Sequence, residues 1–211
     1  MGTKERRERE KEKLRVRILD TAREMFAAEG YEAVTMRRIA DRIEYSPTAI
    51  YFHFRDKEAL IKELCDVDFY TLAQQFTKIA RLKDPIEKLR RIGRAYLDFG
   101  LKKPNHYRLM FMTPHPEIDL MKSKVQHGNP EEDAYAFLRS VIAEGAAEKR
   151  FRPELRDIDL IAQTVWAGVH GVISLHIAKA NDGWVSWRPL NKRAEAMLDA
   201  LLEGLIRKRR E

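Results

Sequence analysis

The chain has 211 residues, of which 35% are charged, and its formal net charge is +7. This length suits one large domain or a small domain followed by a medium one, with enough chain for an apolar core. The basic balance fits either a polyanionic partner or simple solubility. Cys65 is the only cysteine, which excludes a disulfide-stapled scaffold and places the chain in the reducing cytoplasm.

One stretch raises the question of a membrane. Residues 160–178 contain no Asp, Glu, Lys or Arg and approach the ~20 residues that a membrane-spanning helix needs. Polar side chains interrupt this stretch at Gln163, Thr164, His170, Ser174 and His176. We therefore predict a deeply buried helix and no membrane association. The N-terminal residues carry charges with no apolar segment behind them, which is not the pattern of a secretory signal.

The first thirty residues change character at Leu14. Residues 4–13 alternate Lys or Arg with Glu and lack an apolar stripe, which predicts a solvated tail or a frayed helix extension. Arginines that reach a DNA minor groove are the less favoured alternative for this tail. An amphipathic helix then follows, and Gly30 suits the left-handed residue that ends it. Its apolar positions are Leu14, Ile18, Ala22, Met25 and Phe26.

The stretch from Thr35 to Lys57 predicts two short helices joined by a tight turn. Thr35 can cap the first helix, and Ser46 can cap a second helix that has Pro47 at its first position. The apolar residues that would hold the two helices together are Ile39, Ala40, Ile43, Ile50 and Phe54. This is the geometry of a helix-turn-helix.

The remainder of the chain reads as helices, with no convincing strand. A long helix follows from Asp56 to about Arg81, and further helices are expected over 84–103, 105–112, 130–150, 157–179 and from Pro189 to the basic run 207–210. Residues 113–129 contain two prolines and no sustained period, so they are the best candidate for a mobile connection. The predicted fold class is all-α.

Several motifs stand in register between Ile18 and Leu60. They are Gly30-Tyr31, Thr35, Ile39-Ala40, Ser46, Ile50-Tyr51, His53-Phe54 and Lys57-Glu58-Ala59-Leu60. This segment resembles the DNA-binding domain of TetR-family transcriptional regulators. Farther on, Trp166-x-x-x-His170-Gly171 is similar to a C-terminal domain, found in one branch of these regulators, that is named after its Trp, His and Gly.

The resemblance implies an N-terminal three-helix DNA-binding domain followed by a larger helical ligand-binding and dimerisation domain. We divide the chain into a tail (1–13), a helix-turn-helix domain (14–58) and an effector-binding and dimerisation domain (59–211). The resemblance further implies a homodimer, a helical effector pocket in each subunit, and release of DNA when a small molecule binds. The expected partners are thus double-stranded DNA with a pseudo-palindromic operator and an effector of unknown identity.

The predicted DNA-binding residues come from both helices and their caps. Tyr51 and His53 match family positions that typically contact phosphate, although a core-edge tyrosine and a structural histidine are the alternatives. Arg37 is long enough to reach a phosphate or a base. The helix starts at Thr35 and Lys57 could clamp phosphates. The full set is Thr35, Arg37, Ser46, Pro47, Thr48, Ala49, Tyr51, His53 and Lys57.

Two positions depart from the pattern of the family. Glu44 stands where the family usually has glycine in the turn, and a positive φ on glutamate could cost about 1 kcal/mol, which leaves open a differently built turn. Pro47-Thr48 stands where many members carry a basic or amide residue and then glycine. Base readout should therefore depend on Thr48, Ala49 and Arg37.

Six residues could line a pocket for a flat or apolar effector, with His170 as the polar group, although ordinary core packing explains each of them equally well. They are Tyr96, Tyr107, Met110, Phe137, Trp166 and His170. No histidine has metal-ligand spacing, so we expect neither a metal nor a cofactor. Gly168 and Gly171 on the uncharged helix, with the leucine-rich last helix, predict a four-helix bundle across a two-fold axis.

Two other classes of function compete with a regulator. An all-α enzyme with a vestigial helix-turn-helix lacks support, because the sequence offers no nucleophile–base pair, phosphate loop or metal motif. A non-specific basic DNA-binding protein is suggested only by the net charge of +7. We therefore expect a sequence-specific regulator that is not an enzyme, and more specifically a repressor that an effector releases from its operator.

Overall fold

The structure is a computed structural model that describes residues 3–116, 123 and 125–207, and for Thr3 its backbone alone. Its packing divides the chain into two compact units, Met1–Asp68 with Asn105–Lys124, and Phe69–Pro104 with Val125–Glu211. The described residues form helices, with a single isolated bridge between Phe151 and Ile206 and no strand. The all-α prediction is confirmed. The packing boundary falls inside helix α4 (Lys57–Thr77), between Asp68 and Phe69.

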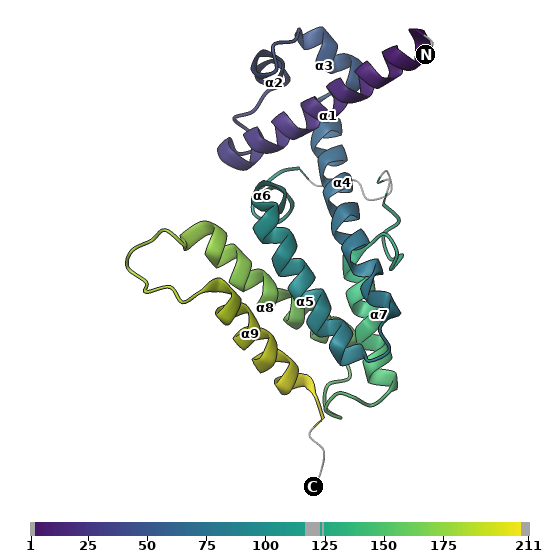
Figure 1. Ribbon diagram of the computed structural model, residues 1–211, viewed down its shortest axis with the longest axis vertical. Coiled ribbons are helices and arrows are strands. Elements are labelled where there is room, and N and C mark those ends of the chain that lie inside the picture. The colour runs from purple at the N-terminus through teal and green to yellow at the C-terminus, as the bar shows by residue number, and fades with distance from the viewer. Residues whose placement is uncertain (1–2, 117–122, 124, 208–211) are drawn as a thin grey trace. The chain divides into compact units, whose positions relative to one another are not determined.

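The first unit contains α1 (Thr3–Glu29), α2 (Met36–Arg42), α3 (Pro47–His53), the first half of α4, and α6 (Pro104–Phe111) (Figure 1). The two seven-residue helices are too short to be stable alone, so they depend on the core that they share with α1 and α4. This core is fully buried and apolar. It includes Ile18, Ala22, Phe26, Ile39, Ala40, Ile43, Ile50, Leu60 and Leu64.

The turn between α2 and α3 contains a left-handed glutamate. Glu44 has a φ of 60°, and the amide of Tyr45 donates to the carbonyl of Ala40 at 3.0 Å. The alternative of a differently built turn is therefore wrong: the chain keeps the left-handed turn without glycine. The strain, of the order of 1 kcal/mol, is tolerated because the buried faces of both helices fix the backbone on either side.

The charged tail is the first part of a continuous helix. Helix α1 runs unbroken from Thr3 to Glu29, and the side chains from Lys4 to Lys13 are exposed. Arg6 donates to Glu10 at 2.9 Å, one helical turn farther on. Of the two forms expected for this segment, the helix extension is the one present. Gly30 ends the helix with a φ of 84°, as predicted.

A buried carboxylate joins three helices of the first unit. Asp68 on α4 is fully buried and accepts two hydrogen bonds from the guanidinium of Arg23 on α1, at 3.0 and 3.1 Å. The same carboxylate lies 2.8 Å from Nδ1 of His106 on α6. Because the carboxylate has no contact with water, its charge is compensated only by these partners.

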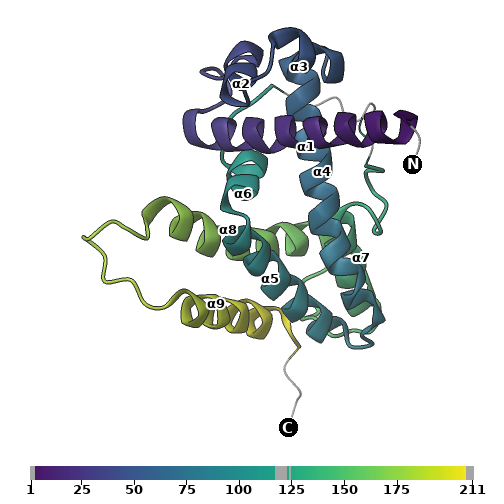
Figure 2. The same ribbon diagram turned by 45° about the horizontal axis from the view of Figure 1, so that its top comes forward.

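The second unit contains the rest of α4, a 3₁₀ turn (Ile79–Arg81), α5 (Pro85–Lys102), α7 (Ala134–Ala147), α8 (Ile158–Lys179) and α9 (Leu190–Leu205). Helix α5 packs against α7, α8 and α9, and α8 packs in turn against α7 and α9 (Figure 2). Asp84, Asp133 and Asp157 cap α5, α7 and α8 through their carboxylates. The predicted helices of this region are thus confirmed to within a few residues.

The prediction that α8 is deeply buried is wrong for the single chain. The helix is long and apolar enough to cross a membrane by length and composition, yet only 28% of its most apolar window is buried within the chain. Its buried side packs against the neighbouring helices of the second unit, whereas Leu160 and Leu175 are exposed. Gly168 is a close-packing position inside the chain, because an added Cβ would lie 2.4 Å from a methyl group of Leu201 on α9.

Two predicted segments fall partly outside the described residues. In the expected connection 113–129, the described part contains turns and no helix, while residues 117–122 and 124 lie outside the description. Most of the basic run 207–210 likewise lies outside the described residues.

Replacing the buried carboxylate tests its structural role. Asp68→Asn should lower the free energy of unfolding by about 3 kcal/mol, because the buried Arg23 guanidinium then loses its buried counterion and keeps only Asp20, whose side chain is largely exposed. Urea denaturation of the full chain measures this loss. As a control, Glu10→Gln removes a carboxylate from an exposed pair and should leave the midpoint unchanged. Equal midpoints for Asp68→Asn and wild type would contradict a structural role for the pair.

Candidate functional site

The candidate nucleic-acid interface is built on the caps of α2 and α3. The hydroxyl of Thr35 accepts from the amide of Arg38 at 3.2 Å, and that of Ser46 accepts from the amide of Ala49 at 3.3 Å. Pro47 occupies the first turn of α3. Ile50 points into the core, so the rest of α3 is turned outward. Both predicted caps are confirmed.

None of the nine predicted DNA-binding residues is buried. Tyr51 has 52% of its surface exposed, which places it outside the core. The other exposed members are Thr35, Arg37, Ser46 and Thr48, and the half-buried ones are Pro47, Ala49, His53 and Lys57. The structure thus leaves all nine accessible on the helix-turn-helix and its flanks.

The pKa of His53 is lowered in the structure, which favours the neutral form of its ring. Partial burial lowers the pKa of its imidazole, and the nearby cations Lys11 and Arg15 lower it further. Its ring lies 5.6 Å from the ring of Phe52 in an edge-on arrangement. A neutral imidazole carries one N–H, so His53 can donate one hydrogen bond to a phosphate oxygen.

Polar groups at the start of α4 already have partners within the protein. The Asp56 carboxylate accepts from the amide of Ala59 at 2.7 Å, and this bond is the main reason why the pKa of Asp56 is lowered. The Lys57 ammonium donates to the carbonyl of Tyr31 at 3.0 Å and lies 4.0 Å from the centre of that ring. Lys57 therefore anchors the loop after α1, and its predicted phosphate contact remains a prediction.

Two cation–π contacts between α1 and aromatic rings at the end of α3 were not predicted from the sequence. Lys11 lies 5.2 Å from the ring centre of Phe52, and Arg15 lies 5.5 Å from that of Phe54. Phe52 is 72% exposed. Extending the helical period of α1 back through the tail would have placed Lys11 on the side that faces the core, because Lys11, Leu14 and Ile18 are three and four residues apart.

In the second unit, three of the predicted effector residues form a hydrogen-bonded chain. The indole N–H of Trp166 donates to the hydroxyl of Tyr96 at 3.0 Å, and that hydroxyl lies 3.3 Å from Nδ1 of His170. Burial lowers the pKa of His170, which favours a neutral ring, and in the tautomer that carries the proton on Nε2 the Nδ1 atom can accept a hydrogen bond from the tyrosine hydroxyl. Trp166 is still 38% exposed.

The other three predicted effector residues lie elsewhere. Phe137 is buried in the second unit, with its ring centre 5.9 Å from that of Phe76. Tyr107 and Met110 are buried in the first unit, where the Tyr107 ring lies 4.9 Å from that of Phe111. Their roles in effector binding remain predictions.

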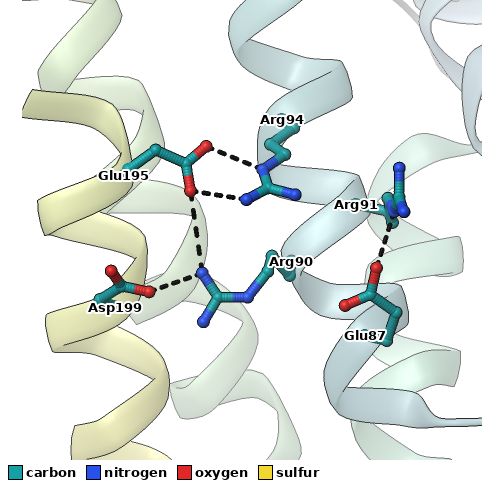
Figure 3. A network of polar contacts seen from close by, with 6 residues as sticks. All are labelled: Glu87, Arg90, Arg91, Arg94, Glu195 and Asp199. Carbon is teal, nitrogen blue, oxygen red and sulfur yellow. Dashed lines mark hydrogen bonds and ion pairs between the residues drawn. The ribbon is translucent and has the colours of Figure 1, made fainter. Parts of the chain in front are cut away.

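A surface groove of about 660 Å³ lies among α4, α5 and α9, and none of the six predicted effector residues lines it. Ion pairs between α5 and α9 border it: Arg94 holds Glu195 through two hydrogen bonds, at 2.7 and 2.8 Å, and Arg90 contacts Asp199 at 2.6 Å (Figure 3). Arg94 lowers the pKa of Glu195. These ion pairs at the edge of the groove hold α5 and α9 together.

Two family models cover most of the chain. The model for bacterial regulatory proteins of the tetR family matches residues 18–64, and a model for a tetracyclin repressor-like C-terminal domain matches residues 89–201. The chain belongs to the TetR family. As a TetR-family protein it is a bacterial regulatory protein of the helix-turn-helix type, as the motifs of its first sixty residues indicate.

Individual relatives agree with this assignment. The transcriptional regulator UidR of Escherichia coli K12 is 38% identical over 73 residues, which are 35% of this chain and only 34% of that regulator. The transcriptional repressor KstR2 of Mycolicibacterium smegmatis is 28% identical over 167 residues, 72% of this chain and 76% of that repressor. This TetR-family chain thus spans about a third of the length of the UidR relative.

Solved structures share the fold. The ketosteroid transcriptional regulator KstR2 of Mycobacterium tuberculosis has a TM-score of 0.67 and 22% identity, with 92% of this chain and 95% of that chain covered. A TetR-family regulator of Marinobacter aquaeolei has a TM-score of 0.73 and 18% identity, covering 97% of this chain and all of the other. At these levels of sequence identity, the similarity of the TetR-family chain to the two structures establishes only its fold.

Two substitutions on α3 should separate affinity from base preference. Tyr51→Phe removes a phenol that can donate to phosphate, so it should weaken binding similarly on all DNA sequences. Thr48→Ala should instead change the preference at one base pair. Fluorescence anisotropy with cognate and scrambled duplexes measures both effects. Equal effects of both substitutions on both duplexes would contradict this division of roles.

Proposed function

We propose that this protein is a sequence-specific transcriptional repressor that binds an operator through α2 and α3 and leaves it when a small molecule binds. The observation that carries the proposal is the two-sided character of α3, which buries Ile50 and turns Thr48 and Tyr51 outward. That arrangement suits a recognition helix in a major groove. The relative KstR2 of Mycolicibacterium smegmatis is named a repressor, which supports the direction of regulation.

Recognition is divided between bases and phosphates. Thr48 and the Ala49 methyl group can contact base edges, and the exposed Arg37 can reach a base or a phosphate. Tyr51 and His53 donate to phosphates, with Thr35 and Ser46 at the caps. Because few side chains read bases, one protomer alone discriminates weakly between sequences.

A homodimer would supply the missing selectivity. The side of α8 that remains uncovered carries no charge and includes Leu160, Thr164, Ala167, Gly171 and Leu175, which recur three and four residues apart. On α9, three exposed small residues stand four apart, Ala196, Ala200 and Gly204. Such faces permit close helix packing. They support a two-fold bundle of α8 and α9 from two protomers, and hence a pseudo-palindromic operator.

We place the effector site at the hydrogen-bonded group of Tyr96, Trp166 and His170. The Tyr96 hydroxyl accepts from the indole N–H and lies within hydrogen-bonding distance of the imidazole nitrogen. A flat, mainly apolar ligand with one hydrogen-bonding group could replace that hydroxyl and stack on the half-exposed indole. Phe137, Tyr107 and Met110 stay candidates for the apolar lining.

Selection of bound DNA from a random pool by the full-length protein tests this proposal. We expect one enriched sequence with two-fold symmetry, because two recognition helices would read two half-sites about 10 bp apart. Repeating the selection with a metabolite library should identify a compound that releases the enriched DNA. The protein would act in the cytoplasm, where the bacterial chromosome lies.

The other results of this selection would contradict the proposal in different ways. Uniform enrichment with strong salt dependence would indicate a non-specific DNA-binding protein. Absence of any enrichment would favour an all-α protein whose helix-turn-helix does not bind DNA. An enriched sequence without two-fold symmetry would contradict the proposed dimer.

A further inference from the structure

The helical tail of α1 has two different faces. Counting back from the buried Ile18 in helical steps, the side that packs in the core carries Leu14, then Lys11, Arg7 and Lys4. We call Lys4, Arg7 and Lys11 the cation stripe. Within the part of the chain that the structure describes, no ion pair involves Lys4 or Arg7. Glu8 lies at the margin of the stripe and offsets one of its three charges.

On the opposite face of the tail, two arginines form hydrogen bonds within the helix. There Arg6 donates to Glu10 at 2.9 Å, and Arg9 donates to the backbone carbonyl of Glu5 at 3.4 Å. Arg6 and Arg9 on this outer face thus have partners within the helix. Those on the stripe are turned toward the side on which α1 packs against the helix-turn-helix.

The stripe begins beside the recognition helix. Lys11 lies over the ring of Phe52, which stands in the sequence between the two predicted phosphate contacts Tyr51 and His53. One turn farther along α1, Arg15 lies over Phe54. Both cations also lower the pKa of His53, which reflects their closeness to that ring. Arg15 is ion-paired with Glu63 of α4, whereas no ion pair of Lys11 is found among the described residues, so at this edge of α3 helix α1 contributes positive charge mainly through Lys11.

The dimensions of the stripe match those of a DNA strand. From Lys11 to Lys4 the helix advances by roughly 10 Å, at about 1.5 Å per residue. Along one strand of B-DNA the phosphates are spaced by about 3.4 Å of helix axis. Three cations over this length can therefore meet phosphates that follow those contacted by Tyr51 and His53.

We propose that Lys4, Arg7 and Lys11 form a phosphate-binding stripe that extends the DNA contact of each protomer beyond the recognition helix. The stripe adds affinity without base preference, because phosphates carry no direct sequence information. The proposal rests on the proposed function as a DNA-binding protein. It gives a role to a segment that otherwise reads as a solvated helix end.

Two triple variants of the full-length protein test the stripe. The stripe variant is Lys4→Gln, Arg7→Gln and Lys11→Gln, and the matched control is Arg6→Gln, Arg9→Gln and Lys13→Gln on the outer face. Both remove three positive charges from the same helix. Fluorescence anisotropy with cognate and scrambled duplexes at several salt concentrations gives the slope of log affinity against log salt. Circular dichroism verifies that both variants keep the helix content of the wild type.

The stripe variant should weaken binding to cognate and scrambled DNA by the same factor and reduce the salt slope by about three per protomer, while the control changes the slope by less than one. Equal losses in both variants, or an unchanged slope in the stripe variant, would overturn the inference while leaving the proposed function intact. Failure of the wild-type protein to bind any duplex would instead refute the proposed function itself.

Discussion

The helix-turn-helix depends on the burial of one side of two helices that could not exist alone. Helices of seven residues are unstable in water, so α2 and α3 hold their shape only because Ile39, Ile43 and Ile50 are removed from solvent. The same packing forces the left-handed turn at Glu44. Every outward side chain of α3 is therefore oriented by the core beneath it, and the proposed DNA recognition depends on that orientation.

Polar contacts fix the surroundings of this core. The buried Asp68 joins Arg23 of α1 to His106 of α6, and Lys57 anchors the loop after α1 through Tyr31. Both contacts hold elements that carry or flank the interface. Helix α1 consequently does two things, since its apolar residues support α2 and α3 and its N-terminal cation Lys11 lies over Phe52 of α3.

Local signals in the sequence predicted much of this structure. Caps such as Thr35 and Ser46, and the helix end at Gly30, act through neighbouring residues, so sequence alone located them. Contacts between distant residues could not be read this way, as Arg23 with Asp68 illustrates. Helix α8 was misjudged for another reason: an exposed apolar face has the same composition as a buried one, so composition alone does not reveal its burial. Its bounds were correct and its burial was not.

The central claim is that this chain is one half of a two-fold DNA reader. Hydroxyl-radical footprinting on the selected duplex, with the stoichiometry of the complex measured in parallel, tests it most directly. The account predicts two protected patches centred about 10 bp apart on one face of the duplex, with two protomers bound. A single protected patch with one protomer, or even protection along the whole duplex, would contradict it.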